Sequence, residues 1–132
     1  MAKRVLVVDD DPDTVALVQA ALRREGFEVA AAGNGAEGLL AIDACRPDLL
    51  ILDVTMPIMS GYQVLQVLRD QPETKSIPVI MLTARREDVD VTRSLLGGAD
   101  LHLSKPFEMR DLVTAARAIL SASDPDQNPD AG

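Results

Sequence analysis

The sequence predicts an α/β fold in which helices cover both faces of a doubly wound, five-stranded parallel sheet. Short apolar runs without polar alternation recur along the chain, as is typical of strands that are buried on both faces. Each run is followed by a segment whose apolar residues repeat at helical spacing, and most of these segments end at glycine or proline. Strands and helices that alternate in this way imply parallel strands joined by right-handed crossovers.

The first two units show how each element is predicted. A strand near Val5–Val8 precedes a helix, which Asp11 can cap and which has Pro12 in its first turn. Gly26 ends this helix, since glycine is common just past a helix C-terminus. The second unit consists of a strand at Phe27–Ala32 and a short helix at Ala36–Ala44.

The other three units follow the same pattern, and the long apolar run of the third strand predicts a central position in the sheet. Their expected elements, in chain order, are strand Leu49–Leu52, a helix from Ser60 or Gly61 to about Arg69, strand Ile77–Leu82, helix Arg86–Leu96, strand Leu101–Ser104 and helix Met109–Leu120.

Composition narrows the class of protein. A chain of 132 residues is expected to form one domain, and we place it at residues 1–121. Residues 122–132 have no apolar period and are expected to be a disordered tail or the stub of a linker. The net charge of −8 argues against direct nucleic-acid binding by this domain and against docking on anionic membranes. A single cysteine, Cys45, permits no intramolecular disulfide, so we expect a cytoplasmic protein.

Polar side chains stand where four of the expected strands end. Asp9 and Asp10 follow the first strand, Asp53 the third, Thr83 the fourth and Lys105 the fifth. The carboxyl ends of parallel strands share one edge of a sheet, where open α/β folds bind their ligands. Each residue alone has an ordinary structural role such as helix capping, but their order on successive strands predicts a site for a divalent cation and a phosphoryl group.

The residue types indicate phosphoryl transfer to an aspartate. The Asp53 carboxylate can attack phosphorus and form an aspartyl phosphate. Asp9 and Asp10 offer the carboxylate oxygens with which proteins bind Mg²⁺. The Lys105 ammonium can pair with a phosphoryl oxygen, and the Thr83 hydroxyl can donate a hydrogen bond to another. Positioning and electrostatics supply most of the catalysis of such a transfer.

Four segments together resemble the receiver domain of two-component response regulators, chemotaxis regulators among them. They are VLVVDDDP, LLILDVTMPIMSGY, PVIMLTA and LSKPF, and the resemblance covers about residues 3–121. It implies a flavodoxin-like fold with strand order 2-1-3-4-5. It also implies a phosphoprotein that takes its phosphoryl group from a sensor histidine kinase or a phosphotransfer protein.

The resemblance also assigns roles to single residues. Asp53 would be the phosphoacceptor and would also belong to the metal site. Asp10 would be a direct Mg²⁺ ligand, Asp9 would act largely through water, and the backbone carbonyl of Thr55 would complete the metal site. Thr83 would supply the switch hydroxyl, and Lys105 would bind the phosphoryl group. The Lys105-Pro106 peptide would be cis. His102 would be a switch side chain, at a position where tyrosine or phenylalanine is common.

Signalling in this family would pass from the site to a surface of the domain. The expected surface comprises Val89–Leu96, Leu101–Ser104 and Leu112–Leu120, and it would act on a downstream protein or on an output domain. The domain would be a monomer or a dimer that forms on phosphorylation. It would not be an enzyme with an external substrate, although it would catalyse its own phosphorylation and dephosphorylation.

Two other interpretations remain open. Gly33–Gly38 fits the G-x-G-x-x-G fingerprint of dinucleotide-binding domains, and Asp53 stands where such a domain places its ribose-binding acid. Against this, the motif follows the second strand and leaves Thr83 and Lys105 unexplained. The second interpretation is a receiver fold that binds proteins without being phosphorylated, against which the complete set of acids, hydroxyl and ammonium argues.

Overall fold

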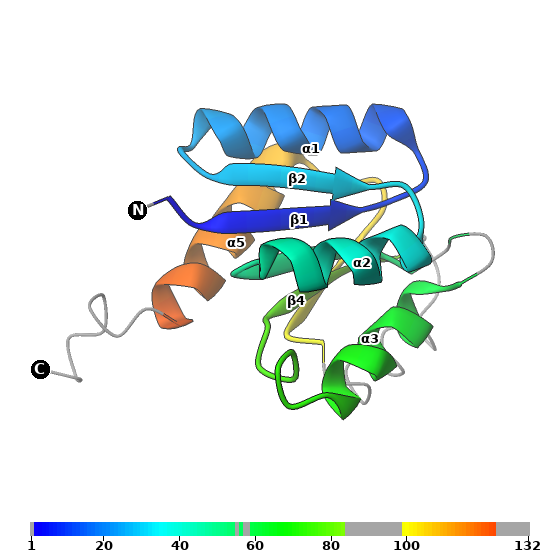
Figure 1. The fold of residues 1–132 in the computed structure, drawn as a ribbon. Helices are drawn as coiled ribbons and strands as arrows, with labels where there is room; N and C mark the ends of the chain where they lie inside the picture. Colours follow the sequence, from blue (N-terminus) through cyan, green and yellow to red (C-terminus); the bar gives the residue numbers. More distant parts are fainter. Residues whose placement is uncertain (1, 55, 57–58, 84–98, 124–132) are drawn as a thin grey trace, which may run out of the picture.

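The computed structural model describes residues 2–54, 56, 59–83 and 99–123, and for residues 122 and 123 it describes the backbone alone. Its centre is a five-stranded parallel sheet in the order β2-β1-β3-β4-β5 (Figure 1). The predicted fold class and strand order are thereby confirmed. The strands are β1 (Arg4–Val8), β2 (Glu28–Ala32), β3 (Leu49–Asp53), β4 (Val79–Thr83) and β5 (Leu101–Ser104).

Helices cover both faces of this sheet. Val18 of α1 and Leu112 of α5 are buried in one apolar cluster, whereas Ile42 of α2 and Leu65 of α3 are buried in another. The sheet therefore lies between α1 and α5 on one side and α2 and α3 on the other. The helix expected at Arg86–Leu96 lies outside the described residues. The helices are α1 (Pro12–Arg24), α2 (Gly35–Cys45), α3 (Gly61–Asp70) and α5 (Met109–Ser123).

The core is aliphatic and centres on β1, β3 and β4. Every residue of β3 and β4 is buried, as the runs without alternation predicted. The pairing register then fixes where the strands end. Val8 is opposite Leu52 of β3, and Thr83 is opposite Ser104 of β5, so the residues that follow these pairs emerge at one edge of the sheet.

Side chains cap the helices that begin near this edge. Asp11 accepts a hydrogen bond from the backbone of Asp13, 3.1 Å away, at the start of α1. At α3, Ser60 and Gln63 form a reciprocal capping box, which satisfies backbone donors that the helix itself leaves unpaired. Capping thus fixes the paths of the loops that carry the polar residues.

Several boundaries of helices and strands differ from those that the sequence predicted. The strand expected from Phe27 begins at Glu28, because the Phe27 N–H donates to the carbonyl of Leu22 and so closes the end of α1. Helix α5 extends to Ser123, past the expected domain boundary at residue 121. Within the described residues, no helix has the length and apolar character needed to cross a membrane.

Candidate functional site

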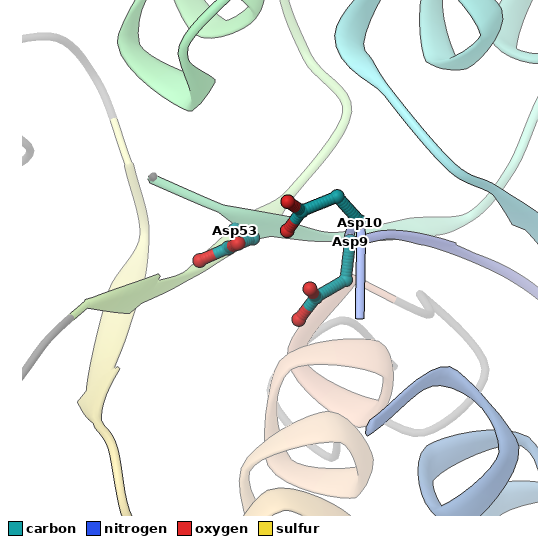
Figure 2. Close-up of side chains that lie close together, drawn as sticks. All are labelled: Asp9, Asp10 and Asp53. Atoms are coloured by element: carbon teal, nitrogen blue, oxygen red, sulfur yellow. The ribbon is translucent and has the colours of Figure 1, made fainter. Parts of the chain in front are cut away.

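Three carboxylates meet at the carboxyl edge of the sheet (Figure 2). Asp9 and Asp10 follow β1, and Asp53 is the last residue of β3. Each offers one oxygen, and these oxygens all lie within 4.8 Å of one another. Asp9 and Asp53 are only 1% and 4% exposed, whereas Asp10 is exposed. Because buried carboxylates are costly without a counter-charge, this cluster requires a cation.

Lys105 supplies one such charge. Its Nζ donates a hydrogen bond to Asp9 Oδ2 at 3.1 Å and lies 3.4 Å from Asp53 Oδ1. Burial alone would lower the pKa of Lys105, but the carboxylates of Asp53 and Asp9 outweigh it and hold this pKa above its ordinary value. The ammonium therefore stays charged at neutral pH. The Lys105-Pro106 peptide is cis, as the resemblance implied.

The two acids after β1 present their oxygens differently. Asp9 Oδ1 accepts from the backbone N–H of Asp11 at 2.9 Å, while its Oδ2 accepts from Lys105. Both oxygens of this buried side chain are thus already engaged by the protein. Asp10 is exposed beside it, so its carboxylate is the more accessible of the pair to an incoming cation.

Thr83 brings a hydroxyl to the same edge. It is the last residue of β4 and only 1% exposed. Its Oγ1 donates to the carbonyl of Leu103 at 3.5 Å, at the long limit for a hydrogen bond. The backbone between the two strands is held more tightly, since the Lys105 N–H donates to the Thr83 carbonyl at 2.7 Å. A fixed backbone with a loosely held hydroxyl leaves Thr83 able to change its partner.

Gly61 packs against the backbone at the end of β3, beside the site, a contact that sequence reasoning missed. Its N–H donates to the carbonyl of Val54 at 2.9 Å. A Cβ added at Gly61 would overlap the backbone oxygen of Asp53 and lie 2.9 Å from the Cα of Val54. The D-x-x-M-P-x-M-x-G spacing from Asp53 to Gly61 includes this glycine, but the spacing alone does not show which backbone atoms it meets. Thr55, expected to contribute its carbonyl, lies outside the described residues.

His102 lies on β5 opposite Met81 of β4. Its side chain is half-buried, and its Nδ1 is buried with no hydrogen-bond partner among the residues that the structure describes. The neighbouring Leu101 and Leu103 pack into the cluster on the α1 and α5 side of the sheet. Because side chains alternate along a strand, His102 faces the opposite side, where Met81 is also buried.

The glycine fingerprint has a structural explanation. A Cβ on Gly35 would lie 2.9 Å from Val64, and one on Gly38 would lie 3.0 Å from Val8, so both glycines allow close packing of α2. The start of α2 is also capped: Asn34 Oδ1 accepts from the Glu37 N–H at 2.8 Å. Glu37 Oε2 in turn accepts from the N–H of Gly33 at 3.1 Å. A carboxylate therefore sits where a dinucleotide fold would bind its pyrophosphate.

A doubly wound sheet with acids, a hydroxyl and a lysine at its carboxyl edge defines a class of phosphoryl-binding α/β domains. The response regulator receiver domain is the family whose model matches this chain, over residues 5–117. The protein therefore belongs to the receiver domains of two-component response regulators. This membership, together with the packing of Gly35 and Gly38, leaves the dinucleotide-binding interpretation without support.

Relatives and solved structures agree with this assignment. The chain is 43% identical to the DNA-binding response regulator MtrA of Mycolicibacterium smegmatis over 120 residues, which are 91% of this chain and 51% of MtrA. It is 44% identical to the transcriptional regulatory protein PrrA of Mycobacterium tuberculosis over 117 residues, covering 89% of this chain and 49% of PrrA. The chain thus spans about half the length of these relatives.

Similar folds are found among solved receiver structures. A putative response regulator from Chloroflexus aurantiacus gives a TM-score of 0.86 at 39% identity, covering 92% of this chain and 99% of that one. The chemotaxis protein CheY4 of Vibrio cholerae gives a TM-score of 0.85 at 31% identity, covering 90% and 99%. At this level of identity the likeness extends to the family as well as to the fold.

Proposed function

We propose that this domain accepts a phosphoryl group on Asp53. The observation that carries the proposal is the position of the Asp53 carboxylate, with Lys105 Nζ 3.4 Å from its Oδ1 and two further carboxylates beside it. A carboxylate attacks phosphorus without help from a general base. Lys105 then pairs with an oxygen of the transferred group, for which a compact ammonium is suited.

A divalent cation fits the same site. Three acids with oxygens within 4.8 Å of one another form a hard, all-oxygen donor set of the kind that Mg²⁺ prefers. We assign direct binding to Asp10 and Asp53, and binding through water to Asp9, whose two oxygens already accept hydrogen bonds. The carbonyl of Thr55 is expected to add a further ligand. When bound, Mg²⁺ would neutralise negative charge on the phosphoryl group and on the acids.

Phosphorylation would then change the partners of Thr83. Its hydroxyl, which holds the Leu103 carbonyl only at 3.5 Å, would donate to a phosphoryl oxygen. The family's histidine kinases, or a phosphotransfer protein, would provide the phosphoryl group. The protein would have no external substrate and would catalyse only its own phosphorylation and dephosphorylation. MtrA is named a DNA-binding regulator, so DNA binding would belong to a part of such proteins beyond the receiver domain.

The test is labelling with acetyl phosphate and Mg²⁺, followed by intact-mass measurement. The protein should gain one acid-stable, base-labile phosphoryl group, and Asp53→Asn should gain none. Asp43→Asn is a matched control, because it removes an exposed carboxylate of α2 and should label as the parent does. Equal labelling of Asp53→Asn and the parent would show that the acceptor is another residue.

A further inference from the structure

A groove adjoins the proposed phosphorylation site and shares only Asp9 and Asp10 with the chemistry described so far. Its lining residues come mainly from α1 and from the end of β2 that leads to α2, and Figure 1 shows where these two elements lie in the fold. Its volume is about 290 Å³, at the small end of the ~300–1,000 Å³ typical of small-molecule pockets. We call it the α1–β2 groove, and its lining residues are Asp9, Asp10, Pro12, Val15, Ala16, Gln19, Ala31, Ala32, Gly33 and Glu37.

The groove combines apolar lining residues with acidic ones. Val15 and Ala16 of α1 and Ala31 of β2 form part of the apolar lining. Asp10 and Glu37 contribute exposed carboxylates, and no basic residue is among the lining residues that the structure describes. An apolar lining that also carries carboxylates suits a ligand that has an apolar stem and a positive head. Lysine and arginine side chains have this character, because their methylene stems pack on apolar surface while the charge stays hydrated.

One of these acids, Glu37, is held in place by the backbone. Glu37 Oε2 accepts from the backbone N–H of Gly33 at 3.1 Å, and the Glu37 N–H donates to Asn34 at 2.8 Å. One carboxylate oxygen is therefore used for capping. The backbone thus fixes a carboxylate in the lining of the groove, so a cation that binds there need not order a flexible side chain.

Position relates the groove to phosphotransfer. Asp9 and Asp10 line both the groove and the acid cluster that includes Asp53. A protein that brings a phosphorylated side chain to Asp53 must therefore cover the surface at Asp10 and the adjoining mouth of the groove. Charge complementarity at such a contact raises association rates and selects partners, and the net charge of −8 adds attraction for a basic surface.

We infer that the α1–β2 groove seats a lysine or arginine side chain of the protein phosphodonor, close to the phosphorylated residue that faces Asp53. The inference rests on the proposed function, since it requires a donor that acts at Asp53. It adds a specificity determinant that works only with protein donors. Acetyl phosphate carries no such side chain, so the groove residues outside the acid cluster should not affect labelling by that donor.

The chemistry of the groove can be tested with a small probe, n-butylguanidinium, and its neutral analogue n-butylurea. Each is titrated into the protein at saturating Mg²⁺, which occupies the acid cluster, while amide NMR shifts are recorded. The guanidinium should shift the amides of Val15, Gln19, Ala31 and Gly33, and the urea should shift them much less. Equal shifts with both compounds, or guanidinium shifts confined to Asp53 and its neighbours, would overturn the inference.

Variants of the groove residues distinguish the contribution of its charge to guanidinium binding from the contribution of its shape. Glu37→Gln keeps an oxygen for the Gly33 N–H but removes the charge, and it should weaken guanidinium binding roughly two- to fivefold, as expected for a surface ion pair. Asp43→Asn removes a charge from the same helix outside the groove and should leave the affinity unchanged. Ala31→Leu and Ala16→Leu, both at exposed positions, should fill the groove and abolish the shifts. Unchanged binding in Glu37→Gln and in both leucine variants would also refute the inference.

Acetyl phosphate labelling of the same proteins distinguishes this inference from the proposed function. If the parent and Glu37→Gln are labelled equally but the guanidinium does not bind in the groove, the inference fails and the proposed function stands. If the parent is not labelled at Asp53, the proposed function fails, and the role of the groove in phosphotransfer fails with it.

Discussion

Lys105 Nζ lies 3.1 Å from Asp9 Oδ2, although 96 residues separate the two positions in the chain. Asp9 is 1% exposed, so its charge is compensated inside the protein by an ammonium that comes from the other end of the sequence. The same ammonium lies 3.4 Å from Asp53. Lys105 thus links the acid that stays engaged with the protein to the acid that is proposed to react.

This arrangement predicts unequal effects of the two acids on Mg²⁺ affinity. Asp10→Ala should weaken Mg²⁺ binding more than Asp9→Ala does, because Asp10 is exposed whereas Asp9 already accepts from Asp11 and Lys105. Calorimetry or amide shifts on Mg²⁺ titration would give both affinities; the chain has no tryptophan to serve as a fluorescent probe. An Asp10→Ala protein with the Mg²⁺ affinity of the parent would contradict the assignment of direct ligands.

The contact between Gly61 and Asp53 predicts a substitution that affects stability and labelling together. Gly61→Ala places a methyl group against the backbone oxygen of Asp53, and such overpacking destabilises proteins by about 1–3 kcal/mol. It should also slow acetyl phosphate labelling by displacing the acceptor. Gly33→Ala is the control, because its Cβ would meet only Glu37 Oε2 at 3.5 Å, an ordinary contact. Urea denaturation and labelling rates measure both effects, and a Gly61→Ala protein as stable as Gly33→Ala would be inconsistent with this packing.

Asp11 predicts a pH-dependent contribution to stability. The Thr14 hydroxyl and the Asp13 N–H donate to its carboxylate and hold the pKa of Asp11 below its ordinary value of 3.8. Because the folded-state pKa is lowered, the contribution is present above that ordinary value and is lost as pH falls through the lowered one. Urea midpoints of the parent and Asp11→Ala should therefore differ most above pH ~4 and converge in more acidic solution. A difference that stays constant or grows on acidification would argue against the capping interaction.

The sequence predicted the fold and the site residues for a physical reason. Central strands such as β3 are buried on both faces, so they show uninterrupted apolar runs whose ends mark the carboxyl edge. The polar residues that follow these runs could therefore be placed together before any coordinates were known. The sequence could not predict which acid Lys105 contacts most closely, because this contact depends on side-chain geometry across several strands.

Other features depend on packing between distant segments. The glycines at 35 and 38 match a nucleotide fingerprint by spacing, but their function here is to let α2 approach Val64 and Val8. No local sequence pattern distinguishes a glycine that binds a nucleotide from a glycine that allows close helix packing. The α1–β2 groove likewise forms from residues after β1, on α1, at the end of β2 and on α2, and none of these segments has a sequence signature for it.

His102 predicts how phosphorylation would reach the surface of the domain. Its Nδ1 is buried without a hydrogen-bond partner among the described residues, an arrangement that costs free energy. His102 lies opposite Met81, and Thr83 follows Met81 by two positions on β4. The hydroxyl of Thr83 donates only a long, weak hydrogen bond to the Leu103 carbonyl. If Thr83 turns to a phosphoryl group at Asp53, the space that it leaves becomes available to the His102 ring. We expect His102 to move inward and to shift β5, and Leu101 and Leu103 of that strand, which pack against the cluster that contains Leu112, would carry the change to α5.

Beryllofluoride, a mimic of the aspartyl phosphate, tests this prediction through amide shifts. Adding it with Mg²⁺ should shift the signals of β5 and of the first turns of α5 as well as those of the site, because a ligand changes a conformational equilibrium only through different contacts in the two states. His102→Ala should keep the shifts at Asp53 and Thr83 but reduce those in α5, since the moving ring is gone. Shifts that stay within the loops at the strand ends, with residues 101–104 unchanged, would show that the signal leaves the site by another route.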